Sequence, residues 1–357
     1  MNTDRKTLKP LQIGEMTAEK PIIQGGMGVG VSRSSLAGAV AAEGGIGIIS
    51  TAQIGYDEEG FEQDQAGCNR IAIRKHIRRA KEIAGGRGLV GVNIMVALKH
   101  YKEHVQEAVK AGADVIISGA GLPMDLPKLV GECKTKIAPI VSSRRAAQLI
   151  LKMWDHRYNR TADFIVIEGP KAGGHLGFSR EQLKDIEELD YDEEIKEIIA
   201  CKTPYEEKYG TKIPVIIAGG IFDRVDIDHA MDLGADGVQI ASRFVATEEC
   251  DAADAYKQAY IHAEKKDIQI IQSPVGMPGR ALRNEFIMGL ENGRKPIRKC
   301  YNCLEKCDPR SVPYCITKAL IDAVKGDVKN GLIFCGENVS RIHEMTTVHD
   351  LMQELCY

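Results

Sequence analysis

The 357-residue sequence lacks any long apolar run and any large excess of charge of one sign. No apolar stretch approaches the ~18 residues of a membrane-spanning helix, so we expect no membrane partner. Lys and Arg number 47 against 50 Asp and Glu, and a net charge of -3 creates no field that would attract nucleic acid. The expected partner is therefore a small-molecule substrate, and association into a homo-oligomer stays open.

The N-terminus lacks the apolar segment of a secretory signal peptide. It reads MNTDRKTLKPLQIG, with charged residues from Asp4 onward. We therefore expect a cytoplasmic protein, whose ten cysteines are thiols, metal ligands or redox groups rather than disulfides. Glycine, in contrast, is abundant: 36 of 357 residues, or about 10%, against a usual ~7%.

Eight short β-branched runs alternate with amphipathic helical patterns. Most runs are apolar on both faces, as expected for parallel strands buried beneath helices. Eight such units favour the α/β class and a closed (β/α)8 TIM barrel, because an open doubly wound sheet usually has about five or six strands. The predicted strands are 21–26, 45–50, 88–95, 114–121, 138–143, 163–169, 213–220 and 237–244.

Two intervals between strands contain extra residues, at about 51–70 and 179–212. We interpret both as loops inserted after strands, at the end of the barrel where active sites lie. The strand–helix repeat stops near residue 245. The chain is therefore divided into an N-terminal arm, the barrel and a helical, cysteine-rich C-terminal extension that packs on the barrel, with bounds of 1–20, 21–250 and 251–357.

Glycine-rich turns follow the first and seventh predicted strands, at 25–30 and 218–221, and a turn with small residues follows the eighth, at 239–243. Glycine at a strand end lets the backbone approach a flat or anionic ligand closely. In (β/α)8 barrels, the last two of these turns commonly bind phosphate through backbone N–H groups. The alternative is that the glycines only permit flexible turns or tight helix–strand packing.

A single histidine follows the sixth predicted strand, in the segment EGPKAGGHLG at 168–177. At this end of a barrel an imidazole can serve as an acid or base near neutral pH, which makes His175 the candidate catalytic residue. A purely structural histidine is the alternative. We expect no metal site formed by histidines.

Four cysteines fall within 16 residues, in the pattern C-x2-C-x3-C-x7-C. Soft thiolates that converge from a short, Pro-bearing loop suit Zn²⁺ or an iron–sulfur cluster. The alternative is a cap of reduced thiols without metal. These four residues are Cys300, Cys303, Cys307 and Cys315; the other six cysteines are scattered, and we interpret them as small core or surface residues.

The segments PIIQGGMG, GVNIM, DFIVIEGPKAGGHLG, PVIIAGGI and ADGVQIASRF resemble, in order and spacing, the nitronate monooxygenase (2-nitropropane dioxygenase) family and the related flavin-dependent enoyl-acyl-carrier-protein reductases. The resemblance covers about residues 10–290 and implies an FMN-binding barrel with His175 as the catalytic acid–base. The family often has Gln where Glu168 stands. The residues implied to bind FMN are Gly25, Gly26, Met27, Asn93, Glu168, Gly173, Gly219, Gly220, Gln239, Ile240, Ala241 and Ser242.

The resemblance implies an FMN-dependent oxidoreductase that oxidises alkyl nitronates with O2. The alternative is an NAD(P)H-dependent flavin reductase acting on an enoyl thioester or a quinone, since GVNIM and ISGAG match the enoyl reductases equally well. An iron–sulfur cluster would favour this alternative, because a one-electron relay has no obvious use in nitronate oxidation. A third hypothesis is a flavin-binding protein without turnover. We expect the arginines of 276–284 to pair with carboxylates rather than to bind substrate.

Overall fold

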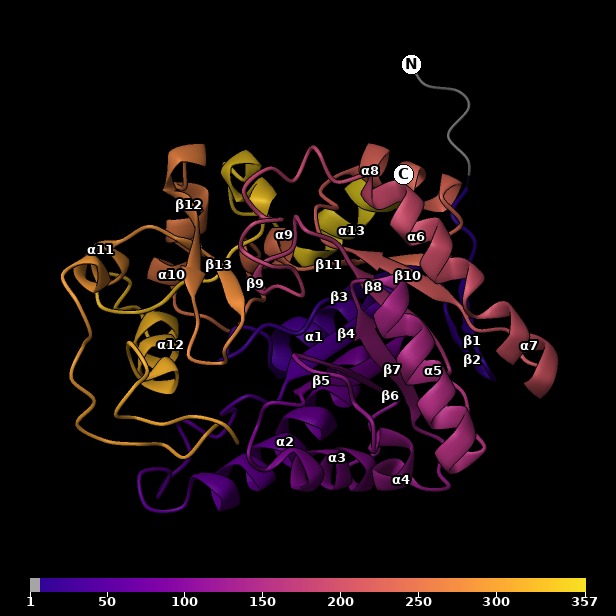
Figure 1. Cartoon of the computed structure of the whole chain (residues 1–357), viewed down its shortest axis with the longest axis horizontal. Helices are drawn as coiled ribbons and strands as arrows, with labels where there is room; N and C mark the ends of the chain where they lie inside the picture. The colour runs from indigo at the N-terminus through magenta and orange to yellow at the C-terminus, as the bar shows by residue number, and fades with distance from the viewer. Residues whose placement is uncertain (1–6) are drawn as a thin grey trace.

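The protein is built around a closed barrel of eight parallel strands, as seen in a computed structural model that describes residues 7–357 (Figure 1). The strand order is β10-β11-β3-β4-β5-β6-β7-β8, and β11 closes the barrel by pairing with β3. Each strand overlaps one of the eight predicted runs, which confirms the (β/α)8 fold. The strands are β3 (Ile22–Gln24), β4 (Ile46–Ser50), β5 (Leu89–Met95), β6 (Val115–Gly119), β7 (Lys136–Val141), β8 (Ile165–Glu168), β10 (Val215–Ala218) and β11 (Gly237–Ile240).

A short hairpin blocks the N-terminal end of the barrel. It consists of β1 (Leu11–Ile13) and β2 (Met16–Ala18), which pair antiparallel. Leu11 and Ile13 are fully buried and join the apolar cluster that fills the barrel interior. The hairpin lies in the predicted arm, of which residues 1–6 lie outside the described part of the chain. Because the lower end is filled, only the C-terminal end of the strands can hold a ligand.

Helices cover the barrel, and local sequence sets their ends. The side chains of Asp64, Ser143 and Asp223 accept hydrogen bonds from the first backbone N–H groups of α2, α5 and α8. Gly85 and Asn159 end α2 and α5 in the left-handed conformation. The helices are α1 (Ser34–Ala42), α2 (Gln65–Ala84), α3 (Tyr101–Lys110), α4 (Leu126–Val130), α5 (Arg144–Tyr158), α6 (Tyr191–Ala200), α7 (Thr203–Tyr209) and α8 (Arg224–Asp232).

The segment 179–212 differs from the inserted loop expected there. It contains α6 and α7, and α6 packs beside α5 as a helix of the barrel wall. Asp190 caps α6, while Ile195 and Ile198 are buried beneath it. The acidic residues of α6 occupy its solvent-exposed face, which gave the segment its loop-like composition. The other expected insertion, 51–70, is a series of turns up to residue 64, and α2 begins at Gln65.

The chain after the barrel forms a second layer over the C-terminal ends of the strands. It contains two strands that the periodicity did not predict, β12 and β13. They form a three-stranded antiparallel sheet with β9 (Gly174–His175), in which β13 lies between β12 and β9. The elements of this layer are α9 (Ser242–Val245), α10 (Asp254–Ile261), β12 (Ile268–Gln272), β13 (Pro278–Leu282), α11 (Glu285–Glu291), α12 (Ile316–Val324) and α13 (Val348–Cys356).

The last helix, α13, returns to the barrel and lies against both α1 and α8. Val348, Leu351, Met352 and Leu355 are buried there, and the Arg243 guanidinium pairs with Glu354 on the outer side. Since α9 has only four residues, α13 fills the position of the eighth barrel helix. The C-terminal segment is thus part of the barrel wall, while the division of the chain near residues 20 and 250 stays a prediction. Among residues 7–357, no helix has both the length and the apolar character needed to cross a membrane.

Candidate functional site

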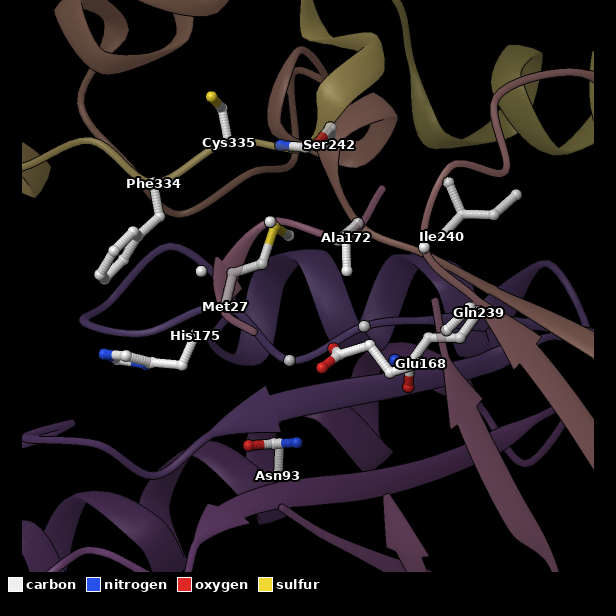
Figure 2. A pocket seen from close by; sticks show the side chains of 18 of the residues that line it. Met27, Asn93, Glu168, Ala172, His175, Gln239, Ile240, Ser242, Phe334 and Cys335 are labelled. Carbon is white, nitrogen blue, oxygen red and sulfur yellow. Dashed lines mark hydrogen bonds between the residues drawn. The ribbon is translucent and has the colours of Figure 1, made fainter. Parts of the chain in front are cut away.

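A cavity of about 230 Å³ opens at the C-terminal end of the barrel strands. Its floor is formed by the ends of β3, β5, β8, β10 and β11, and its roof by the segment 334–338 (Figure 2). His175 and all twelve residues expected to bind a cofactor line it. The structure therefore brings together residues that are up to 217 positions apart, from Gly25 to Ser242.

The turn after β3 presents backbone to the cavity. Ser32 closes this turn, because its hydroxyl accepts a hydrogen bond of 2.7 Å from the Met27 N–H. A Cβ atom at Gly26 would lie 2.5 Å from the Cβ of Asn93, so only glycine fits between the turn and β5. The Gly25 N–H donates to the Ile240 carbonyl at 2.8 Å, which joins this turn to the end of β11.

The turns after β10 and β11 form the opposite end of the cavity. Gly219 and Gly220 have φ angles of +90° and +95°, which favour glycine, and a Cβ at Gly219 would lie 2.8 Å from the Gly169 carbonyl oxygen. The Ser242 hydroxyl accepts a hydrogen bond of 3.0 Å from the Gly336 N–H. The glycine backbone after β10 and the small residues after β11 thus border a space that suits a phosphate.

Three polar side chains that line the cavity, those of Asn93, Glu168 and Gln239, make no side-chain hydrogen bond to any described residue. The Gln239 Oε1 atom is buried without a hydrogen bond to any described residue. No hydrogen bond from the described residues reaches the side chains of Asn93 or Glu168 either. Burial raises the pKa of Glu168 to about 8, so this carboxyl is protonated at neutral pH. It then carries one donor and one acceptor, as a Gln side chain would.

This arrangement fits a flavin. The isoalloxazine ring is flat and has donors and acceptors along one edge, which the unpaired groups of Asn93, Glu168 and Gln239 can satisfy. The glycine turns after β3 and β10 leave room for the ring and for its phosphate. The protonated Glu168 offers a donor and an acceptor, as would the Gln that the family resemblance implies at this position.

His175 projects from β9 into the cavity beside Phe334 (Figure 2). Its Nε2 atom lies 2.8 Å from the Ser273 Oγ, and its ring meets the Phe334 ring edge-on with centroids 5.0 Å apart. Burial lowers the pKa of His175 to about 4, so the imidazole is neutral at physiological pH. A neutral, fixed imidazole can accept a proton from a bound substrate.

The roof of the cavity was missed from the sequence. It consists of Phe334 and the residues that follow it, held by a bridge between Phe334 and Ala281 of β13 and by the Tyr260 hydroxyl, which donates to the Phe334 carbonyl. A Cβ at Gly173 would lie 2.6 Å from the Cys335 carbonyl carbon, so Gly173 lets the roof pack closely. The sequence signal for this segment was the run GLIFCG, a short apolar run that ends in glycine.

The arginines of 276–284 have structural partners, as expected. Arg280 is 2% exposed; its guanidinium donates to the carbonyls of Pro170 and Ala172, and its Nε lies 2.8 Å from Glu337. Arg280 therefore ties the loop after β8 to the roof. Arg283 pairs with Glu291 at 3.5 Å on the surface.

The four clustered cysteines lie apart from this cavity and line a second, smaller one. No group of three His, Cys, Asp or Glu residues in the described part of the chain is arranged to hold a single metal ion. All ten cysteines are free thiols.

Comparison with known proteins places this site in a family. Residues 9–357 match the family model described as nitronate monooxygenase. A probable nitronate monooxygenase from Bacillus subtilis (strain 168) is 24% identical over 363 residues, covering 94% of this chain and 95% of the relative. The solved structure of FabK from Thermotoga maritima superposes with a TM-score of 0.70 at 26% identity, covering 95% of this chain and 92% of that chain.

A further relative comes from Mycobacterium tuberculosis (strain ATCC 25618 / H37Rv). It is 26% identical over 277 residues, which are 78% of this chain and 67% of the relative. Its name is (3aS,4S,5R,7aS)-5-hydroxy-7a-methyl-1-oxo-octahydro-1H-indene-4-carboxyl-CoA dehydrogenase. Because the family model spans nearly the whole sequence, the chain belongs to the nitronate monooxygenase family and is an FMN-dependent oxidoreductase of that type.

Proposed function

We propose that this chain binds FMN in the cavity at the C-terminal end of the barrel and catalyses the oxidation of an alkyl nitronate by O2. The observation that carries the proposal is the convergence of His175 and the twelve expected cofactor residues on one cavity, with three polar side chains unpaired inside it. Membership of the nitronate monooxygenase family supports the same reaction.

Each part of the cavity has a defined task in this proposal. The turns that contain Gly219, Gly220, Ala241 and Ser242 hold the phosphate, and Asn93, Glu168 and Gln239 hydrogen-bond the ring. FMN supplies the two-electron chemistry, accepting electrons from the substrate and passing them to O2. The protein orients both partners and supplies one proton-transfer group.

His175 is that group. Its Nε2 atom is held by Ser273, so the ring has one fixed orientation. Its Nδ1 atom makes no hydrogen bond to any described residue, and we assign proton exchange with the substrate to this atom. Because the imidazole is neutral above about pH 4, it can take the Cα proton of a neutral nitroalkane, which gives the nitronate.

A reductase is the second candidate, in which NAD(P)H donates electrons and an enoyl thioester or a quinone accepts them. The name of the Mycobacterium tuberculosis relative supports a thioester substrate, because that protein is a carboxyl-CoA dehydrogenase. Oxidation of a nitronate needs neither an iron–sulfur cluster nor zinc at the four clustered cysteines, which are Cys300, Cys303, Cys307 and Cys315. A redox-active cluster would favour the reductase.

Anaerobic mixing separates the two reactions. The purified protein is mixed in turn with an alkyl nitronate, NADH and NADPH while the flavin absorbance is followed. Bleaching by the nitronate alone supports the proposed reaction, and bleaching by a nicotinamide nucleotide alone supports the reductase. FMN released by denaturation and measured against protein should approach one per chain; a chain without flavin would contradict both.

We also propose a cytoplasmic location, since a reducing compartment suits ten unpaired thiols.

A further inference from the structure

The four clustered cysteines surround a cavity that the proposed reaction does not use. Cys300, Cys303, Cys307 and Cys315 all line a space of about 30 Å³. Apolar side chains complete its wall, which limits the access of water; they are Ile297, Leu304, Pro309, Val312 and Ile316. Thiols that served only as packing groups would be expected to close together rather than to leave a shared space.

Hydrogen-bond donors point at three of the four sulfurs. The Asn302 N–H donates to the Cys300 Sγ at 3.3 Å, and Asn302 has a φ of +51°. The Thr317 side chain hydrogen-bonds Cys303, and backbone N–H groups at the start of α12 point at Cys315. Such donors stabilise sulfur when it carries negative charge, as it does when bound to a metal.

Contacts with the barrel fix the loop that carries these cysteines. The Lys99 N–H donates to the Cys303 carbonyl at 3.1 Å, and the Glu305 N–H donates to the Ala97 carbonyl at 3.0 Å. Leu98 and Leu304 form an antiparallel bridge between these bonds. The loop after β5 therefore positions Cys303 by main-chain pairing, so the cysteine loop has a defined place in the fold.

Four thiols that line one cavity match the four thiolate ligands of an iron–sulfur cluster. Zinc binds thiolates at about 2.3 Å, which requires four sulfurs within about 3.8 Å of one another and leaves no space between them. No three metal-binding side chains among residues 7–357 are arranged in this way. A cluster of several irons and sulfides fills a larger space and holds its four cysteines further apart.

We propose that Cys300, Cys303, Cys307 and Cys315 bind an iron–sulfur cluster. This inference goes beyond the proposed oxidation of a nitronate, which needs no such group. Each thiol gives up its proton as its sulfur binds iron.

The proposed cluster lies next to the flavin cavity. Cys315 immediately precedes α12, and Leu320 of the same helix lines the flavin cavity. Leu320, Cys303 and Cys315 all pack against the same cluster of buried apolar side chains. Five residues of helix separate Cys315 from Leu320, a rise of about 7.5 Å. The two cofactors would therefore be separated by about one helix turn and a leucine side chain.

The test is anaerobic reconstitution of the full-length chain with ferrous iron and sulfide. The proposal predicts iron and acid-labile sulfide in equal amounts, with a broad visible absorption beneath the flavin bands and a paramagnetic signal after reduction with dithionite. Cys303→Ser and Cys307→Ser should each lose most of the iron. Cys133→Ser, which alters an exposed cysteine outside the cluster, should bind as much iron as the wild type.

Three results would overturn the proposal: one zinc bound without sulfide, no metal bound, or full iron binding by the cysteine variants. Circular dichroism of each variant shows whether it is folded. If Cys303→Ser does not fold, Cys300→Ser replaces it, because Cys300 is exposed and its substitution should leave the fold intact.

Discussion

The Nε2 atom of His175 lies 2.8 Å from the Oγ of Ser273, a residue 98 positions further along the chain. Pairing of β9 with β13 creates this contact, with His175 beside Gly279 in the register. The candidate acid–base of the barrel is therefore oriented by the layer that follows the barrel.

Ser273→Ala tests this positioning role. We expect kcat to fall roughly tenfold, about 1.4 kcal/mol, because the imidazole loses one fixed hydrogen bond. KM should change little, and Ser273→Thr, which keeps a hydroxyl, should restore most of the rate. Steady-state kinetics with a neutral nitroalkane, which must give up its Cα proton to His175, measure both constants. Wild-type kcat in Ser273→Ala would show that Ser273 does not position His175.

Glu168 makes the free energy of unfolding depend on pH. Its pKa is about 8 in the folded chain and 4.5 in the unfolded chain, so between these two pH values the folded state binds more protons than the unfolded state. The stabilisation is complete below pH 4.5 and is lost as the pH rises through about 8. Relative to Glu168→Gln, the wild type should therefore lose roughly 2–3 kcal/mol between about pH 6 and pH 9.

Urea unfolding of both proteins at each pH measures this difference. Parallel pH profiles for the wild type and Glu168→Gln would mean that the Glu168 carboxyl is already ionised at neutral pH. FMN content should stay near one per chain in Glu168→Gln, because the amide offers the same donor and acceptor as the protonated acid.

Gly220→Ala tests the turn assigned to the phosphate. Gly220 has a φ of +95°, and a Cβ there would lie 2.9 Å from the Lys171 Cβ, so the turn must shift. We expect FMN affinity to fall at least tenfold in equilibrium dialysis. Gly210→Ala is the matched control. Gly210 also has a positive φ, but it ends α7, and no atom lies within 4 Å of the position that its Cβ would take. Equal loss of FMN in both variants would indicate general destabilisation instead.

Leu351→Ala tests the inference that α13 completes the barrel wall. Leu351 is fully buried between α13 and the barrel, so its truncation should cost about 2–5 kcal/mol of unfolding free energy. Leu351→Met, which nearly conserves volume, should cost less than about 1.5 kcal/mol. Urea unfolding gives both values. A cost below 1 kcal/mol for Leu351→Ala would show that α13 is only loosely attached.

The barrel was predictable because most of its strands are apolar on both faces and most of the predicted runs end in glycine or serine. His175 and the glycine turns followed from their places at strand ends. The α6 helix was not recognised, because its acidic face outweighed Ile195 and Ile198 in the sequence. Phe334 reaches the cavity, and Ser273 reaches His175, only through long-range pairing around β13, for which one sequence offers no periodic signal.

The central claim is that this cavity holds FMN for nitronate oxidation and that His175 takes the Cα proton when the substrate is supplied as the neutral nitroalkane. Anaerobic stopped-flow mixing of the wild type and His175→Ala with a neutral nitroalkane, which must lose its Cα proton to become the nitronate, tests it most directly. We predict rapid bleaching of the flavin in the wild type and bleaching slowed by about 10²–10⁴-fold in His175→Ala, with FMN content unchanged. Absence of bleaching in the wild type, or equal rates in the two proteins, would contradict the claim.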